Sequence, residues 1–214
     1  MKFAPEGYPF IAGTVGLTVL VFLFIPFGAV IPALLAAFML YFFRDPERNV
    51  PDEKDIFVAP ADGKIILIRE MHESKYLKKG AREISIFMSP MDVHVNRAPC
   101  DGRVKQVVHN KGRFHAAYKD EASLQNENIE MVLETEYGDV LVRQVAGFLA
   151  RRAVCRKRAG DVLERGERYG VIKFSSRVDL YLPPDARIRV SLGDMVKAGE
   201  TTIGGMDPRG RRWD

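Results

Sequence analysis

The stretch "GVIKFSSRVDLYLP" (residues 170–183) predicts two strand segments on either side of a pair of serines. Both flanks are rich in β-branched and aromatic residues, which are enriched in strands. Between them stand Ser175 and Ser176, two small hydroxyl residues, and the charged residues Arg177 and Asp179 follow at once. Taken alone, such a pair indicates a solvent-facing kink in an edge strand. A more specific interpretation needs support from the rest of the chain.

Short apolar or alternating segments continue the strand pattern toward both ends of the soluble part. They recur about every 8–12 residues with turn residues between them, as in a compact sandwich or barrel. A hairpin is expected where 131–137 meets 139–145 around Gly138. Helix is sparse here, and residues 116–125 are the best candidate. We therefore expect a mainly β (α+β) fold with a compact barrel-sandwich-like domain over 56–214. Further strands are expected within 56–70, 82–90, 101–110 and 186–192.

The N-terminal segment has a different character, because no Asp, Glu, Lys, Arg or His occurs between Gly7 and Phe43. One helical membrane span needs about 20 residues, so this run is too long for one span and barely long enough for two. "IPFG" (residues 25–28) supplies a Pro-Gly break at its middle. The pattern predicts a hydrophobic helical hairpin over 1–43, membrane-associated and either spanning or re-entrant.

A charged, proline-containing linker is expected at 44–55, directly after the apolar run. Its Arg44, Arg48 and Lys54 favour the cytoplasmic side of a membrane by the positive-inside rule. Two alternatives are a cleaved signal peptide and a buried soluble hairpin. The run is much longer than the apolar region of a signal peptide, which spans about 7–15 residues. It also lacks the polar stripe that a soluble amphipathic helix shows.

Composition bounds the remaining possibilities. The 214 residues carry a formal charge of +4 with a pI near 9.1, an excess too small to identify an anionic partner. Cys100 and Cys155 form no C-x-x-C motif, and we expect both to be small buried residues in a reducing compartment. The four histidines have no metal-site spacing, and neither a G-x-S-x-G motif nor a phosphate-binding glycine loop occurs.

Polar residues at the ends of apolar strands are the remaining candidates for chemistry. Asp62 lies in a turn after "VAPA", and His94 follows the strand that ends near Met88. Arg151 and Arg152 follow another strand. Each has a plain structural interpretation, since Asp-Gly is a common turn pair, a histidine can cap a loop, and an arginine pair is often solvated. No single one of them establishes a function.

Taken together and in order, the motifs carry a resemblance. "VAPADGKI", "FMSPMDVHVNRAPCDG", "NEN", "VAGFLARRAV" and "IKFSSRVDLYLP", behind the hydrophobic "FFRDPER" segment, resemble the pyruvoyl-dependent phosphatidylserine decarboxylases. The short proteins known as phosphatidylserine decarboxylase-related fit best. The resemblance covers nearly the whole chain, and five ordered motifs make it specific.

The resemblance implies that the chain cuts itself before Ser176. The Ser176 hydroxyl would attack the carbonyl of Ser175, and loss of the Ser176 α-proton would release the upstream chain. The dehydroalanine left at position 176 would then hydrolyse to a pyruvoyl group and release ammonia. The products would be a β chain (1–175) and an α chain (176–214) that begins with this pyruvoyl group, the only cofactor expected, with no metal. The family's usual residue before the cut is glycine. This chain has Ser175 instead, and because serine adds a Cβ that glycine lacks, we expect the cut to be slower.

The resemblance also implies roles for other residues. Asp62 and His94 match the family's acid–base pair, and histidine has a suitable unperturbed pKa of about 6.5. Many relatives have a second histidine where this chain has Arg97. Two assignments therefore stay open, in which His94 is the base for self-cleavage or the proton donor in turnover. Arg97, Arg151 and Arg152 are weak candidates for binding the lipid phosphate.

The implied reaction is the decarboxylation of phosphatidylserine to phosphatidylethanolamine. The pyruvoyl ketone would condense with the substrate amine and accept the electron pair released with carbon dioxide. The resemblance implies a prokaryotic cell membrane with the catalytic domain on its cytoplasmic face. It also allows a homodimer, and we expect no nucleic-acid partner.

Three alternatives remain open at this point. The substrate could be another serine-headgroup lipid or a soluble amino acid. Ser175 could leave a family member that no longer matures. Finally, "SLGDMVKAGETTIGG" (residues 191–205) resembles the hairpins of lipoyl and biotinyl domains, so a non-catalytic carrier modified at Lys197 is conceivable.

Overall fold

The computed structural model describes residues 2–112, 126–147, 152–173 and 176–207. The helix expected at 116–125 lies outside these residues. The chain divides into two compact units, and each is described here by itself. The first holds Met1–Glu47 with Met91–Val93, and the second holds Arg48–Pro90 with His94–Asp214. The division after Glu47 falls inside the segment expected to be a linker.

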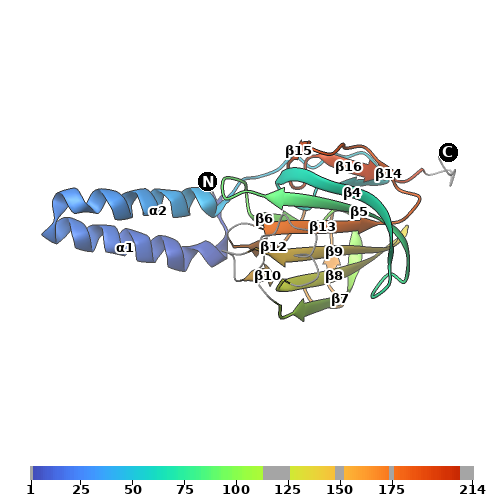
Figure 1. Ribbon diagram of the computed structural model, residues 1–214, viewed down its shortest axis with the longest axis horizontal. Helices are drawn as coiled ribbons and strands as arrows, with labels where there is room; N and C mark the ends of the chain where they lie inside the picture. Colours follow the sequence, from blue (N-terminus) through green and yellow to red (C-terminus); the bar gives the residue numbers. More distant parts are fainter. Residues whose placement is uncertain (1, 113–125, 148–151, 174–175, 208–214) are drawn as a thin grey trace. The chain divides into compact units, whose positions relative to one another are not determined.

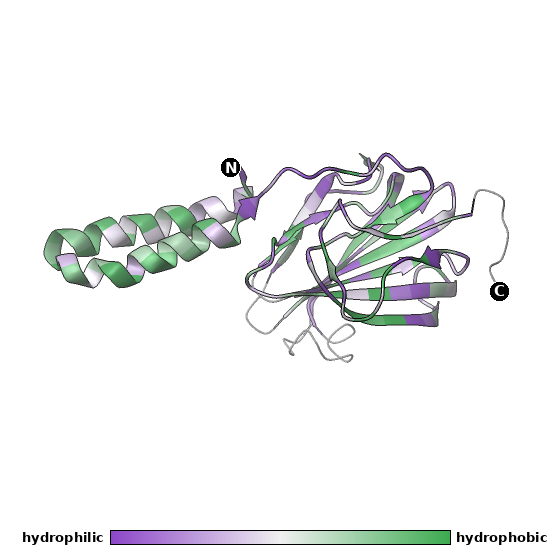
Figure 2. Cartoon of the chain, turned by 90° about the horizontal axis from the view of Figure 1, so that it is seen from above, coloured by the Kyte–Doolittle hydropathy of each residue, from purple (hydrophilic) through white to green (hydrophobic). Residues whose placement is uncertain are grey.

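The first unit is the expected pair of apolar helices. Helix α1 (Tyr8–Phe24) and helix α2 (Val30–Phe42) are joined by a 3-10 turn, Pro26–Ala29, which begins at the predicted Pro-Gly break. The hydropathy colouring shows apolar residues around both helices (Figure 2). With the short 3-10 turn Pro5–Gly7 before it, the first helical run is long and apolar enough to cross a bilayer, whereas the second is shorter.

Backbone pairing ties the two ends of this hairpin together. Strand β1 (Lys2–Phe3) pairs antiparallel with strand β2 (Arg44–Asp45). Next to this pair, the Ala4 N–H donates to the Phe43 carbonyl at 2.9 Å, and the ring of Phe10 stacks on Phe43 at 5.5 Å. The chain therefore enters and leaves the apolar hairpin at one point.

The second unit is built on an eight-stranded antiparallel sheet with the order β11-β7-β8-β9-β13-β5-β4-β15 (Figure 1). This architecture confirms the mainly β fold. In chain order the strands of the sheet are β4 (Gly63–Glu73), β5 (Lys79–Met88), β7 (Gly102–Asn110), β8 (Asn128–Thr135), β9 (Gly138–Ala146), β11 (Val162–Leu163), β13 (Ser176–Leu182) and β15 (Met195–Val196).

Two smaller sheets complete this unit. Six short strands form them: β6 (Val95–Arg97), β10 (Ala153–Cys155) and β12 (Arg168–Ile172) in one, and β3 (Ile56–Val58), β14 (Arg187–Ile188) and β16 (Thr202–Gly205) in the other. The strand expected within 186–192 is therefore only two residues long.

Strand β13, which begins at Ser176, is a central strand between β5 and β9, and all seven of its residues are buried. The interpretation of the serine pair as part of an exposed edge strand is therefore wrong. Successive side chains of a strand point to opposite faces. The face that Ser176 shares looks into the main hydrophobic core, through Val178, Leu180 and Leu182. On the other face, Arg177 bonds Asp179 and donates to Ser85 Oγ at 2.8 Å.

The predicted hairpin around Gly138 is confirmed. Strands β8 and β9 pair in register from Thr135 opposite Gly138, and two residues form the turn. The Thr135 hydroxyl donates to the Gly138 carbonyl at 2.6 Å and accepts from the Tyr137 N–H at 3.1 Å, which closes the turn. Gly138 has a φ of +101°, a conformation that glycine adopts at low cost.

The segment that resembles a lipoyl-type hairpin has a different pairing. Lys197 is exposed in the turn between β15 and β16. These two strands belong to different sheets, because β15 pairs with β4 and β16 pairs with β14 and β3. Lys197 is therefore not at the tip of a two-stranded hairpin, and the carrier alternative loses its structural basis.

Candidate active site

Three neighbouring strands bring Ser176 and Asp62 to the same end of the large sheet. Ser176 begins β13 and lies opposite Met88, the last residue of β5. Asp62 immediately precedes β4, whose Lys64 lies opposite Phe87 of β5. Since adjacent strands are about 4.8 Å apart, Asp62 and Ser176 lie about two strand spacings, or roughly 10 Å, from each other across the sheet.

Gly63 allows β4 to begin this close to β5. Its φ is +148°, and a Cβ at this position would lie 2.1 Å from the carbonyl oxygen of Phe87. Any other residue would push the two backbones apart. The Asp-Gly pair of "VAPADGKI" therefore has a structural reason, since the glycine lets Asp62 stand directly at the sheet end.

The Ser176 side chain is fully buried in a small polar group. Its hydroxyl donates to the thioether sulfur of Met88 at 3.2 Å, and Asn96 Nδ2 approaches the same sulfur at 3.8 Å. Asn96 Oδ1 in turn accepts a hydrogen bond from Gln144 Nε2 at 2.8 Å. Because a thioether is a weak acceptor, the contact with Met88 holds the Ser176 proton only weakly.

His94 reaches this region through the smaller sheet β10-β12-β6. It directly precedes β6, and only 1% of its surface is exposed. Its backbone carbonyl accepts a hydrogen bond from the Ile172 N–H at 3.2 Å. Ile172 ends β12, four residues before Ser176, so the pairing of β6 with β12 fixes His94 beside the segment that leads to the serine pair.

Asp62 is held as a hydrogen-bond acceptor in an ion pair. Arg48 Nη2 lies 2.9 Å from Asp62 Oδ1 and 2.7 Å from Oδ2, and the Ala198 N–H donates to Oδ1 at 2.8 Å. Both side chains are nearly buried, with 7% of Arg48 and 13% of Asp62 exposed. A cation and a backbone amide at this distance stabilise the ionised carboxylate.

The other predicted site residues have different surroundings. Arg97 is buried, and its guanidinium donates to the Gly166 carbonyl at 2.9 Å. Arg152 is exposed. Ser175 and Arg151 lie outside the described residues.

Of the two cysteines, Cys100 is buried and Cys155 is half-buried. Burial raises the pKa of the Cys100 thiol to about 12. This thiol is therefore unreactive at neutral pH, as expected for a structural residue. No cluster of three His, Cys, Asp or Glu residues with the geometry of a metal site occurs in the described parts of the chain.

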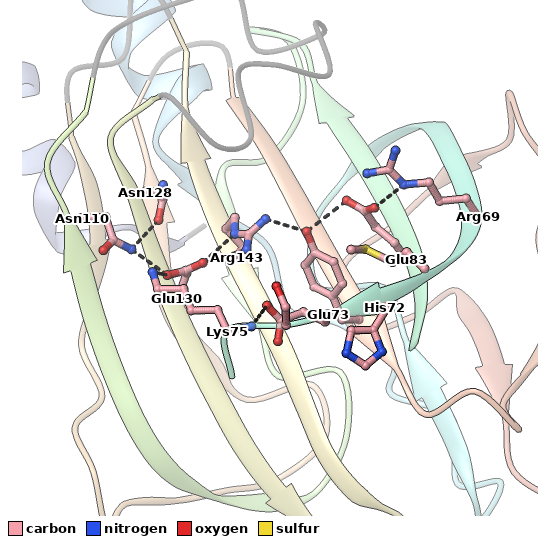
Figure 3. A pocket seen from close by; sticks show the side chains of 12 residues that line it. Arg69, His72, Glu73, Lys75, Glu83, Asn110, Asn128, Glu130 and Arg143 are labelled. Atoms are coloured by element: carbon pink, nitrogen blue, oxygen red, sulfur yellow. Dashed lines mark hydrogen bonds and ion pairs between the residues drawn. The ribbon is translucent and has the colours of Figure 1, made fainter. Parts of the chain in front are cut away.

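A polar hollow of about 490 Å³ is lined by charged side chains such as Glu83, Glu130 and Arg143 (Figure 3). Tyr181 also lines it, and because Tyr181 and Ser176 are five positions apart on β13, their side chains point to opposite faces of the sheet. Tyr181 of β13 lines it and joins its two sides, since its hydroxyl accepts from Arg143 at 2.6 Å and donates to Glu83 at 3.0 Å. Glu83 also accepts from Arg69 at 2.6 Å. The buried carboxylates that line this hollow accept hydrogen bonds from neighbouring side chains. We therefore interpret these residues as a structural network of ion pairs and hydrogen bonds.

Glu130 is the centre of this network. Its Oε2 accepts from Lys75 Nζ at 2.8 Å, from the Tyr76 hydroxyl at 2.6 Å and from Asn110 Nδ2 at 2.6 Å. Its Oε1 accepts from Arg143 Nε at 2.9 Å. Burial raises the pKa of Glu130. The hydrogen bonds from Lys75 and Tyr76 and the charge of Arg143 lower this pKa by more than burial raises it, so the net shift is downward.

Replacing Glu130 with glutamine is expected to destabilise the protein by about 3–5 kcal/mol, because Arg143 and Lys75 would lose the buried carboxylate that they share. The wild type should also lose stability on acidification. The lowered pKa stabilises the fold above the unfolded-state value of about 4.3, and this contribution disappears as the pH falls through the folded-state pKa. Chemical denaturation across this pH range measures both effects.

The matched control for that experiment is Glu53→Gln, which breaks an exposed ion pair with Arg189. This control should change the free energy of unfolding far less, because exposed pairs are screened by solvent. Equal stability losses in the two variants would contradict a structural role for the buried network.

Sequence reasoning missed Arg48, Asn96 and Gln144. In the sequence, Arg48 stands out only as a linker charge that favours the cytoplasmic side. Asn96 lies inside one of the quoted motifs and Gln144 directly precedes another, but an amide within a strand has no spacing signal of its own. For Gln144 the sequence did contain a signal, since this residue and Arg143 are the two polar residues in the strand end "VLVRQVAG".

Comparison with known proteins identifies the family. A family model described as phosphatidylserine decarboxylase matches residues 35–204. A phosphatidylserine decarboxylase proenzyme of Desulfotalea psychrophila is 44% identical over 211 residues, covering 94% of this chain and 95% of the relative. Another, of Pelobacter propionicus, is 47% identical over 208 residues, covering 93% of this chain and 94% of the relative. With similarity at this level over nearly its full length, this chain belongs to the phosphatidylserine decarboxylase family.

Proposed function

We propose that this protein decarboxylates phosphatidylserine to phosphatidylethanolamine after cutting itself between Ser175 and Ser176. The observation that supports this most directly is the position of Ser176, a fully buried serine at the first position of the central strand β13 and at the same sheet end as Asp62. Its relatives are named proenzymes, which is consistent with a chain that is processed before it acts.

The surroundings of Ser176 fit the formation of a pyruvoyl group there. The hydroxyl contacts a weak acceptor, Met88 Sδ, so it can turn toward the preceding carbonyl at little cost. Water is excluded from a position with no exposed surface. The group would supply a ketone that binds the substrate amine and accepts electrons as carbon dioxide leaves.

His94 and Asp62 are the proposed acid–base residues. His94 is buried next to the segment that leads to Ser176, where an imidazole can take or return a proton. Asp62 is paired with Arg48, so we propose that its carboxylate accepts a hydrogen bond and orients the group that donates a proton. Asp62 would have to be the neutral acid to donate a proton itself. The two timings for His94, self-cleavage or turnover, remain separate hypotheses.

Arginines near the site are proposed to attract the anionic headgroup. Arg152 is the most accessible of the described candidates, because it is exposed after β9, whereas Arg97 already donates to Gly166. Arg151 is proposed with it by the resemblance alone. A homodimer, which the resemblance allows, stays a prediction.

We propose that the α1–α2 hairpin holds the protein at the cytoplasmic face of the cell membrane, with its tip inside the hydrocarbon. Helix α2 has 13 residues, which correspond to about 20 Å against a hydrocarbon core of about 30 Å. The tip has no polar side chain, and its Phe27 is 94% exposed. A tip that emerged on the far side would place these apolar groups among lipid headgroups.

The depth of this tip can be measured by fluorescence. In a Trp213→Phe background, which removes the single tryptophan, Phe27→Trp is expected to be quenched most by lipids brominated deep in their acyl chains. Tyr8→Trp, at the start of α1, should be quenched most by shallow bromines. Equal depth at the two positions, or accessibility of position 27 to an aqueous quencher on the far side, would contradict the proposed insertion.

The proposed function is tested by mass and by activity on the purified protein. Wild-type material should consist of two chains, residues 1–175 and 176–214, and should release carbon dioxide from carboxyl-labelled phosphatidylserine. Free serine and a serine-headgroup lipid with a different backbone test the alternative substrates. A single intact chain that releases no carbon dioxide would support the non-maturing alternative instead.

A further inference from the structure

The carboxylate of Asp62 is held by two segments that are distant in sequence. One is Arg48, at the start of the second unit, and the other is the turn 197–201 near the C-terminus. We propose that Arg48 is a positioning residue that, together with this turn, fixes the Asp62 carboxylate at the sheet end where Ser176 lies. This inference rests on the proposed function, in which Asp62 takes part in the chemistry at Ser176.

Arg48 contacts both oxygens of Asp62 through one terminal nitrogen, at 2.9 and 2.7 Å. Its other terminal nitrogen lies 3.5 Å from Glu200 Oε2. The side chain is only 7% exposed, so the interaction with Asp62 is little screened by water. A guanidinium anchored at two points has little freedom to swing, and this restricts the carboxylate that it contacts.

The turn 197–201 completes the arrangement. Its Ala198 N–H donates to Asp62 Oδ1 at 2.8 Å, and Glu200 Oε1 accepts from the Asn49 N–H at 3.1 Å. The Gly199 N–H donates to the Ala59 carbonyl at 2.9 Å. Gly199 has a φ of +76°, and a Cβ there would lie 3.0 Å from Arg97 Cδ, so a larger residue would strain the backbone and crowd the Arg97 side chain.

After the proposed cut between 175 and 176, the residues that hold Asp62 would belong to two different chains. Arg48 and Asp62 would stay in the larger chain, whereas Ala198 and Glu200 would belong to the smaller one. The hydrogen bond from Ala198 to Asp62 and the contact of Glu200 with Arg48 persist only while the small chain stays docked. The turn therefore makes the geometry at Asp62 dependent on both products of maturation.

Replacing Arg48 with glutamine tests the inference. In detergent-dispersed phosphatidylserine we expect kcat to fall by about tenfold or more, with KM nearly unchanged, because Arg48 acts on the carboxylate and not on the lipid. The decisive comparison is with Asp62→Asn. If Arg48 acts through Asp62, the double variant should be no slower than Asp62→Asn alone, since residues in one network are not additive.

Matched variants separate positioning from a general loss of structure. Arg189→Gln, which breaks the exposed pair with Glu53, should keep wild-type kcat. Arg48→Lys retains one positive charge and should recover part of the lost rate. Should Arg48→Gln fail to fold, as judged by its thermal melt, Glu200→Gln offers a milder test that loosens Arg48 without touching Asp62, with an expected loss of about threefold.

The inference is overturned if Arg48→Gln behaves like Arg189→Gln, or if its effect multiplies fully with that of Asp62→Asn. Failure of the proposed function looks different. In that case the wild type itself releases no carbon dioxide from phosphatidylserine, whatever the variants do.

Discussion

Replacing Ser176 with alanine is expected to leave one uncut chain without decarboxylase activity. The hydroxyl is the only group at this position that can attack the preceding carbonyl, and without the cut no ketone forms to receive the substrate amine. The fold should survive, because alanine fits the fully buried position and the substitution removes a weak hydrogen bond, the one to Met88 Sδ. Intact mass and carbon dioxide release from labelled lipid measure the two outcomes.

A matched control for this variant is Ser191→Ala, which removes an exposed serine hydroxyl from the same small fragment. It should be cut and should turn over like the wild type. Two results would refute the assignment: complete processing of the Ser176→Ala chain, or decarboxylation of the lipid by wild-type protein that is still a single polypeptide.

The strands around Ser176 were predictable, but their place in the sheet was not. The enrichment in β-branched and aromatic residues identified β12 and β13 correctly. Arg177 and Asp179, however, suggested an exposed edge, since charged side chains are rarely buried unless they are paired. Their shared network includes Ser85, which lies about 90 residues earlier in the chain, and local sequence patterns contain no information on such distant pairing.

The candidate site shows the same division. Asp62, His94 and Ser176 were selected because ordered motifs resemble a family, whereas spacing and composition predicted only a membrane-attached β domain. The described geometry brings Ser176 and Asp62 to one sheet end. Arg48 could not be selected in this way, because its two partners are Asp62 and Glu200, 14 and 152 residues away. Only the folded chain joins a linker charge to a turn near the C-terminus.

Replacing His94 with alanine is expected to lower the rate of maturation or of turnover by about 10²–10⁴-fold, the usual contribution of a general acid or base. His94 is 1% exposed and lies beside the segment that leads to Ser176, so no bulk water can replace its imidazole efficiently. Self-cleavage, followed by mass, and turnover, followed by carbon dioxide release from whatever fraction is cut, must be measured separately. An uncut variant assigns His94 to maturation, whereas a cut but inactive one assigns it to turnover.

Three comparisons make this result specific to the imidazole. His94→Gln keeps polarity and most of the volume but cannot exchange protons near neutral pH, so it should be as slow as His94→Ala. Added imidazole should restore part of the rate in His94→Ala alone, because only that variant leaves a cavity of the right shape. His109→Ala, at an exposed histidine of β7, should be cut and active like the wild type. A His94→Ala protein that matures and turns over at the wild-type rate would remove His94 from the mechanism and leave Asp62 to act through another donor.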